Sequence, residues 1–314
     1  LADARKPLVL AGGGGWTQKA CNDLTTFAEA NTLPVATAFR RQDLIDNRHP
    51  CFAGVVGLGI NPKLKNRLDD TDLLIVLGTQ LGEIVSGGYT YFTFPKPKQT
   101  MVHIAAGVDE IDKVYQADLG INAGMAEFCA AATDLPPVDT PWSGETKAAH
   151  EDYVAFSTPA EMPGNVNYSE IIGWLSDNLP EDAIITNGAG NYTVWVHRFF
   201  RYKQYGTQLA PQSGAMGYGV PSGVAAGIRH PDRVVVSLNG DGCFQMNGLE
   251  IGTAVQYGTK TIFIVVNNGM YGTIRMHQET HYPKRKSGTD LYNPDFAALA
   301  RSYGAIGETV TNTS

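Results

Sequence analysis

The sequence has few cysteines and no long apolar run, and each shortage excludes a class of protein. The four cysteines, Cys21, Cys51, Cys129 and Cys243, are scattered and form no CxxC pair, which excludes a disulfide framework and a cysteine-ligated zinc site. We therefore expect a reducing, cytoplasmic setting. No apolar run approaches the roughly 18 residues that a membrane helix needs, and no charged-then-apolar leader opens the chain, so we expect neither a membrane anchor nor a secretory signal.

Positive charge is also scarce. Lys and Arg total 24 against 31 Asp and Glu, a net charge of -7, whereas a nucleic-acid partner requires clustered basic residues. We therefore expect no nucleic-acid partner. A hydrophobic content of 43% is enough for a sizeable core, and 314 residues are too many for one average domain, so two domains are expected.

Short aliphatic runs alternate with helix-like segments along most of the chain, a pattern typical of α/β proteins with doubly wound parallel sheets. In the first part we expect strands at 6–11, 33–39, 73–77 and 101–106, with helices at 16–30 and 127–132. In the last part we expect strands at 183–186, 234–238 and 261–266, with helices at 168–179, 217–228 and 249–256. The chain therefore predicts two such domains in succession.

The domain boundaries follow from a change in composition. Residues 136–164 are polar and rich in proline, which indicates a linker, with a short helix around 147–156. We therefore expect a central Rossmann-like domain at 1–135 and a second domain at 165–314. The segment leading to Thr311 reads as the start of another strand, and Leu1 is not a methionine, so we expect the second domain to be incomplete at its C-terminal end and the chain to be a piece of a longer protein.

Two of the expected strands end in polar motifs that together can hold a metal ion and phosphates. Gly240-Asp241-Gly242 follows one strand and Asn267-Asn268 the next, with the 24 residues 243–266 between them. That length fits one crossover of a parallel sheet, which places both motifs at the carboxyl edge, where open α/β sheets bind ligands. Asp241, Asn268 and a following backbone carbonyl then offer the oxygen ligands that Mg²⁺ prefers. The two glycines let the backbone approach a phosphate at a helix N-terminus.

This pair of motifs at this spacing resembles the cofactor motif of thiamine-diphosphate enzymes of the acetolactate synthase and benzoylformate decarboxylase group. The resemblance implies thiamine diphosphate and Mg²⁺ as cofactors. It implies Asp241 and Asn268 as side-chain ligands of the metal, with Met270 giving its backbone carbonyl. It also implies that Gly240, Gly242 and Cys243 lie at the diphosphate.

Two further segments match the same group. Residues 188–192 resemble its first diphosphate-contacting loop, with three implied contacts: Gly190, Asn191 and Tyr192. Residues 213–221 resemble the segment that lies against the middle of the cofactor. There Met216 would wedge between the two rings, a role that suits a bulky, flexible apolar side chain. The carbonyl of Gly214 would accept a hydrogen bond from the aminopyrimidine.

The run after the asparagine pair bears on the substrate. Benzoylformate decarboxylases carry a similar NNGxYG run, which implies a place for Tyr271 at the cofactor. His277 stands where biosynthetic acetolactate synthases carry a Trp that helps choose the second substrate, so a standard branched-chain biosynthetic enzyme is disfavoured and His277 is a candidate catalytic residue. His277 and His281 also share a helix face, but the order His-Gln-Glu-Thr-His is not the HExxH pattern of zinc proteases.

The first domain offers no nucleotide motif of its own. Gly12 to Gly15 follow a strand, but Thr17 occupies the position where a GxGxxG fingerprint needs its third glycine. The domain resembles the central domain of the same enzyme group, which in some relatives holds FAD. Gln80-Leu81-Gly82-Glu83 replaces the Arg expected there, so FAD is doubtful and a spacer and assembly role is favoured.

The resemblance implies decarboxylation or carboligation of a small-molecule 2-oxo acid, with the cofactor as the electron sink. The Glu that activates the cofactor in this group lies in a pyrimidine-binding domain, and no segment here matches it. We expect that domain to come from missing sequence or another chain, a homo-oligomer (dimer or tetramer), and no turnover by this chain alone. The alternatives are a benzoylformate decarboxylase-like enzyme and a non-catalytic cofactor-binding subunit.

Overall fold

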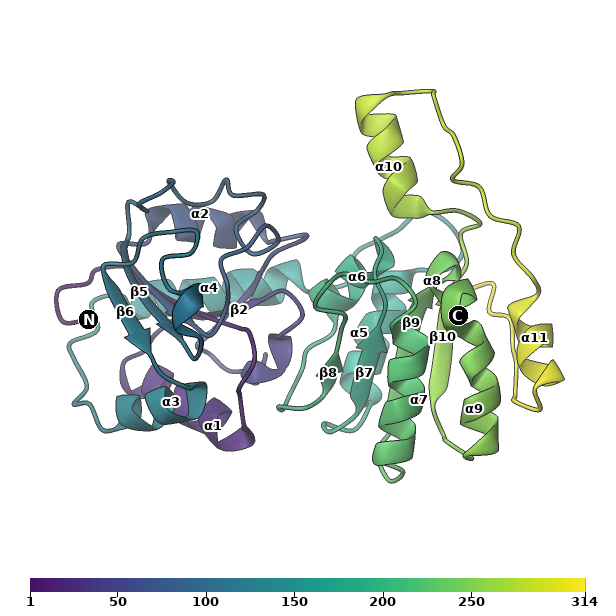
Figure 1. The fold of residues 1–314 in the computed structure, drawn as a ribbon, viewed down its shortest axis with the longest axis horizontal. Coiled ribbons are helices and arrows are strands. Elements are labelled where there is room, and N and C mark those ends of the chain that lie inside the picture. Colours follow the sequence, from purple (N-terminus) through teal and green to yellow (C-terminus); the bar gives the residue numbers. More distant parts are fainter. Residues whose placement is uncertain (314) are drawn as a thin grey trace. The chain divides into compact units, whose positions relative to one another are not determined.

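A computed structural model describes residues 1–313 of the chain. They form two compact units, one of Leu1–Thr158 with Arg201–Tyr205, the other of Pro159–Phe200 with the residues from Gly206 onward. Each unit holds one parallel sheet, as the alternation of strands and helices predicted (Figure 1).

The sheet of the first unit has six strands in the order β3-β2-β1-β4-β5-β6, all paired in parallel. The strands are β1 (Pro7–Ala11), β2 (Val35–Ala38), β3 (Phe52–Val56), β4 (Leu73–Leu77), β5 (Thr100–Ala105) and β6 (Leu119–Asn122). Its helices are α1 (Gln18–Ala30), α2 (Pro62–Asp70), α3 (Met125–Thr133) and α4 (Ser143–Phe156), with single 3-10 turns at Gln42–Leu44 and Val108–Glu110. The strand order reverses between β1 and β4, the arrangement of a doubly wound domain.

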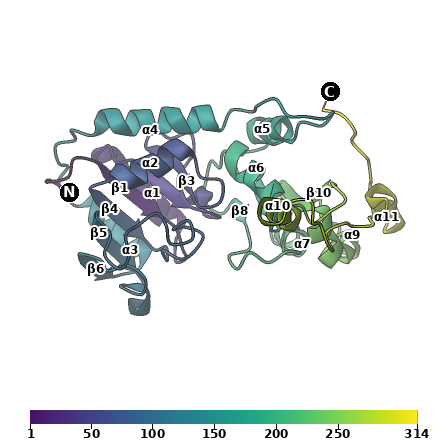
Figure 2. The same ribbon diagram turned by 90° about the horizontal axis from the view of Figure 1, so that it is seen from above.

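Both faces of this sheet are covered, because successive side chains of a strand point to opposite sides. Val9 and Ala11 of β1 are buried with the apolar residues of α1 and α3, whereas Leu8 and Leu10 are buried with those of α2. Figure 1 shows α2 on one side of the sheet and α1 and α3 on the other, and Figure 2 shows α4 running alongside α2. Such burial explains why β1 and β4 read as continuous aliphatic runs rather than alternating ones.

The start of α1 differs by two residues from the predicted 16–30. Thr17 adopts an extended conformation and its hydroxyl accepts a hydrogen bond from Ala20 N at 3.1 Å, so it caps the helix, which begins at Gln18. Trp16 lies outside the helix and its indole donates to the carbonyl of Gly12 at 2.7 Å. The aromatic residue thus packs the glycine turn instead of beginning the helix.

The interval 136–164 was expected to be a linker with a short helix around 147–156, and it contains the 14-residue helix α4. This helix lies in the first unit and contacts β3 and α2. Just before it, the indole of Trp142 is buried and donates to the carbonyls of Asn31 and Thr32, both at 3.1 Å. The guanidinium of Arg67 on α2 also contacts Asp152 at 2.7 Å. The ordered first unit therefore extends to Thr158.

The sheet of the second unit has four parallel strands in the order β10-β9-β7-β8. The strands are β7 (Ile184–Asn187), β8 (Gln208–Leu209), β9 (Val235–Gly240) and β10 (Ile262–Val266). The helices are α5 (Tyr168–Asn178), α6 (Tyr192–Phe199), α7 (Gly219–Arg229), α8 (Asp241–Asn247), α9 (Ile251–Gln256), α10 (Gly272–His281) and α11 (Phe296–Ser302), with a 3-10 turn at Gly248–Glu250 between α8 and α9.

Two expectations for the second unit can be compared directly with the structure. The crossover between the two motifs is as predicted: α8 and α9 lead from β9 to β10, and the two strands are parallel neighbours. The strand expected before Thr311 is not formed, because residues 306–313 are neither helix nor strand. The backbone N–H of Thr313 bonds instead to the carbonyl of Asn165 at 3.1 Å. Ser314 lies outside the described residues.

Within residues 1–313, the structure contains no helix that is both long and apolar enough to cross a membrane.

Candidate functional site

A pocket lies at the carboxyl edge of the sheet in the second unit. It is built from the residues that follow β7, β9 and β10, together with the start of α10 and one residue from the segment before α7. The predicted site residues among its lining are Gly190, Asn191, Tyr192, Met216, Gly240, Asp241, Gly242, Cys243, Asn268, Met270 and Tyr271. The remaining lining residues are Ala189, Val266, Gly272, Thr273 and Ile274.

Strand register explains why the two motifs meet. Gly240, the last residue of β9, pairs with Val266, the last residue of β10. Asp241 and Asn267 therefore leave neighbouring strands at the same level, and Asp241 is also the first residue of α8. Because both strands end together, their polar continuations lie side by side at one edge.

The carboxylate of Asp241 is buried and held by three donors. Its Oδ1 accepts a hydrogen bond from Gly242 N at 2.9 Å. Its Oδ2 accepts from Gly269 N at 2.8 Å and from the side-chain amide of Asn293 at 2.7 Å. The residue is only 3% exposed, so these donors offset the cost of burying a charge away from water. The carboxylate is fixed in position rather than free to rotate.

The asparagine pair forms a tight turn beside this carboxylate. Oδ1 of Asn268 accepts from Met270 N at 3.2 Å, and Gly269 between them has a φ of +69°, a conformation that favours glycine. Asn267 instead directs its Oδ1 toward Gly269 N at 3.3 Å and toward Asn293 at 2.7 Å. The turn therefore brings Asn268 and Met270 into the lining of the pocket.

The loop after β7 is tied to the start of α10 by Thr273. The hydroxyl of Thr273 accepts a hydrogen bond from Asn191 N at 3.0 Å and donates to Asn191 Oδ1 at 2.9 Å. No sequence pattern predicted this contact, which joins residues 82 positions apart. Thr273 thus positions the loop that carries Gly190 and Asn191.

Cys243 and Tyr192 are buried in the wall of the pocket. The thiol of Cys243 donates to the carbonyl of Ala189 at 2.8 Å, so its proton is engaged by the loop after β7. Burial raises the pKa of the Tyr192 phenol well above its ordinary value, which keeps the ring neutral. Both side chains therefore fix α8 against that loop.

The glycines of the GDG motif are packed against aromatic rings. A Cβ added at Gly240 would lie 2.9 Å from the ring of Tyr192, and one at Gly242 would lie 2.6 Å from the ring of Tyr271. The space that the missing side chains leave is thus filled by tyrosine rings. Close packing against these two rings is a further reason why larger residues do not fit at Gly240 and Gly242, both of which line the pocket.

This packing predicts that Gly242→Ala destabilises the second unit by about 1–3 kcal/mol, the usual cost of overpacking. If the clash is with Tyr271, the cost disappears when Tyr271→Ala is already present. Urea unfolding of the two single variants and the double variant measures this coupling. An equal cost of Gly242→Ala in both backgrounds would exclude Tyr271 as the clashing group.

Two predicted residues do not line the pocket. Gly214 lies in a turn at φ +73°, with its N–H bonded to the carbonyl of Pro211 at 2.9 Å, two residues before Met216, which does line it. His277 is exposed on α10, and its ring stacks on that of His281 with centroids 6.2 Å apart. Among residues 1–313, no group of three or more His, Cys, Asp or Glu side chains could hold a metal ion.

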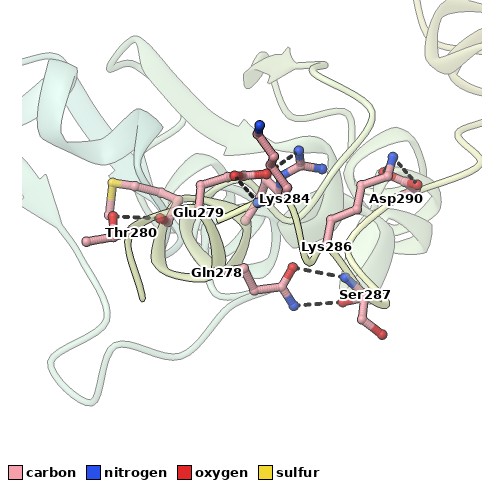
Figure 3. Close-up of polar contacts among 9 residues, drawn as sticks. Gln278, Glu279, Thr280, Lys284, Lys286, Ser287 and Asp290 are labelled. Carbon is pink, nitrogen blue, oxygen red and sulfur yellow. Dashed lines mark hydrogen bonds and ion pairs between the residues drawn. The ribbon is translucent and has the colours of Figure 1, made fainter. Parts of the chain in front are cut away.

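Helix α10 belongs to an excursion of the chain, residues 271–291, that leaves the sheet edge and returns to it. Its base is closed by two backbone hydrogen bonds of 2.9 Å each, Tyr271 N to Thr289 O and Leu291 N to Gly269 O. Figure 3 shows its inner contacts: the amide of Gln278 exchanges two hydrogen bonds with the backbone of Ser287, and Lys286 pairs with Asp290. None of the residues of α10 is buried. The excursion is therefore held by its own polar contacts.

Comparison with known proteins assigns the chain to a family of enzymes. Residues 1–132 match the family model described as "Thiamine pyrophosphate enzyme, central domain", and residues 188–314 match "Thiamine pyrophosphate enzyme, C-terminal TPP binding domain". Together the two matches cover well over half of the chain, which belongs to this family. Similar proteins bear the name of acetolactate synthase.

Among these relatives is the acetolactate synthase large subunit of Parasynechococcus marenigrum (strain WH8102), 30% identical over 99% of this chain and 51% of the relative. The acetolactate synthase isozyme 2 large subunit of Escherichia coli (strain K12) is 26% identical over 99% of this chain and 56% of the relative. The probable acetolactate synthase large subunit of Methanocaldococcus jannaschii is 28% identical over 99% and 54%. The chain thus spans about half the length of the curated relatives it matches.

Proposed function

We propose that this chain is the metal- and diphosphate-binding part of an enzyme that decarboxylates a 2-oxo acid and joins the product to a second carbonyl compound. The observation that carries the proposal is the pocket in which Asp241, Asn268 and Met270 meet at the end of two neighbouring strands. The names of the relatives favour carboligation as the outcome.

The donor set fits Mg²⁺ bound to a diphosphate. Asp241 would supply one anionic oxygen, Asn268 an amide oxygen and Met270 a backbone carbonyl, all of them hard ligands. A single carboxylate would not bind Mg²⁺ tightly by itself. It is sufficient where phosphate oxygens supply further ligands of the octahedral ion. The lone pairs of Asp241 support this role: Oδ2 already accepts two hydrogen bonds, whereas Oδ1 accepts one and retains a lone pair for a cation.

The remaining residues of the pocket would orient the cofactor. Thiamine diphosphate, when bound, supplies the electron sink that lets the carboxylate carbon of a 2-oxo acid leave as carbon dioxide. Asn191, held by Thr273, would contact the diphosphate from the loop after β7. Met216, Val266 and Ile274 would give the apolar wall that keeps water from the rings.

The group that activates the cofactor is proposed to lie outside these residues. The two matched family models are the central and C-terminal domains, and the relatives are about twice as long as this chain. We propose that a pyrimidine-binding domain, from further sequence of the same protein or from another chain, completes the site in a homo-oligomer. On that basis residues 1–314 alone do not turn over substrate.

A second candidate is a decarboxylase that releases the aldehyde. It is favoured by His277, a polar residue in the place of the Trp of biosynthetic acetolactate synthases, and by the run Asn267 to Gly272. Product analysis with a 2-oxo acid and the full-length enzyme distinguishes an aldehyde from a ligated hydroxyketone.

Removal of the metal tests the proposed cofactor site. In a calorimetric titration, full-length wild-type protein is expected to bind thiamine diphosphate in the presence of Mg²⁺ and to lose most of that affinity in EDTA, because Asp241, Asn268 and Met270 would hold the metal, whose positive charge would attract the diphosphate. Undiminished binding in EDTA would contradict the metal site. No binding in either buffer by a demonstrably folded full-length protein would contradict the thiamine diphosphate assignment itself.

A further inference from the structure

The polar network behind the proposed metal ligand involves a residue far along the chain. Asn293 follows the excursion 271–291, two residues after Leu291, whose N–H helps to close the base. Its Nδ2 donates to Asp241 Oδ2 and to Asn267 Oδ1, both at 2.7 Å. One amide group thus joins the two motifs, GDG and NN, that come from separate strands.

A third residue fixes the orientation of this amide. Nε2 of Gln245, on α8, donates to Asn293 Oδ1 at 2.6 Å. With its oxygen used as an acceptor there, Asn293 presents both of its N–H groups to the oxygens of Asp241 and Asn267. The reverse orientation would place an amide oxygen against a carboxylate oxygen, with no proton between them.

The consequence for Asp241 follows from counting lone pairs. Gly269 N and Asn293 Nδ2 together occupy both acceptor sites of Oδ2. Oδ1 accepts only from Gly242 N, so it is the oxygen that remains able to bind a cation. Without Asn293, Oδ2 would regain a free lone pair and the carboxylate could rotate between two arrangements.

We propose that Asn293 is a positioning residue of the metal site: it holds the carboxylate of Asp241 so that Oδ1 keeps a lone pair that a cation could use, and it ties the asparagine turn to that carboxylate. Gln245 supports this role by orienting the amide of Asn293. The inference rests on the proposed function, since it assigns Asn293 to the same Mg²⁺ and thiamine diphosphate site. It also gives the excursion 271–291 a role at the site, because its closed base brings the following residue Asn293 back to Asp241.

The test is a titration of full-length protein with Mn²⁺ at saturating thiamine diphosphate, in which electron paramagnetic resonance measures the free metal. Asn293→Leu keeps the approximate side-chain size and removes the amide, and is expected to weaken Mn²⁺ binding by roughly 10–100-fold, as loss of an outer-shell partner of a metal ligand does. Gln245→Leu is expected to weaken it by a smaller factor. Asn178→Leu, an exposed asparagine at the end of α5, serves as the matched control and is expected to bind Mn²⁺ like the wild type.

The outcomes separate the two proposals. If wild-type protein binds no Mn²⁺ with thiamine diphosphate, the proposed function fails and this inference falls with it. If the wild type binds and folded Asn293→Leu binds equally well, the positioning role is excluded while the proposed function stands. A lower melting temperature of the metal-free variant with unchanged Mn²⁺ affinity would mean a merely structural role and would also overturn the inference. If Asn293→Leu does not fold, Gln245→Leu decides, since it acts through the orientation of Asn293 alone and wild-type affinity in it would contradict the mechanism.

Discussion

Asp241→Ala is expected to abolish magnesium-dependent binding of thiamine diphosphate, with a loss of affinity of more than about 100-fold, because loss of a direct ligand exceeds the 10–100-fold effect of an outer-shell partner. Asp241 is the one carboxylate among the residues that line the pocket. Its removal takes away the only anionic protein ligand proposed for the metal. Calorimetric titration with thiamine diphosphate at saturating Mg²⁺ measures the effect.

The same substitution also affects the unliganded protein. Gly242 N, Gly269 N and the amide of Asn293 all donate to this carboxylate and would lose this acceptor, although Gly269 N and Asn293 would keep Asn267 Oδ1. Each unsatisfied donor costs about 1–3 kcal/mol where water cannot replace the acceptor, so a lower melting temperature is expected as well. Asp232→Ala is a matched control, since Asp232 is an exposed carboxylate of the same unit. Wild-type affinity in folded Asp241→Ala would refute the assignment of the metal ligand.

The meeting of the GDG and NN motifs could be predicted from the sequence because it depends on local signals. Each motif follows a short aliphatic run, and 24 residues between them allow one crossover of parallel strands. In the structure the last residues of β9 and β10 are register partners, Gly240 with Val266. The position of the pocket at this edge follows from those two facts alone.

The network around Asp241 could not be predicted in the same way. Asn293 is 52 residues from Asp241, and the intervening chain includes a strand and the excursion 271–291. Only the closed base of that excursion brings Asn293 back to the motif. The packing of Gly240 and Gly242 could not be predicted either, because their neighbours Tyr192 and Tyr271 come from other segments of the chain. Contacts of this kind depend on tertiary packing, which periodicity does not encode.

Composition indicated only part of the order in residues 136–164. Proline and polar residues there predicted a linker with a short helix around 147–156, whereas the structure has α4 at Ser143–Phe156, and Trp142 before it is 1% exposed. A helix with one narrow buried face, formed by Thr146, Ala149 and Tyr153, looks polar when it is read as a sequence. Helix α4 belongs to the first unit because its residues contact β3 and α2.

Trp142→Ala is therefore expected to destabilise the first unit by about 3–5 kcal/mol, the usual cost of deleting a large buried aromatic side chain. The indole also donates to the carbonyls of Asn31 and Thr32 at the end of α1, so its loss leaves both without this partner. Trp174→Ala is the matched control, since Trp174 is 62% exposed on α5 and its removal should change the free energy of unfolding by no more than about 0.5 kcal/mol. Urea unfolding followed by circular dichroism compares the two. A tryptophan in a linker would behave like Trp174. A change in the free energy of unfolding below about 0.5 kcal/mol for Trp142→Ala would therefore indicate that residues 136–164 are a linker.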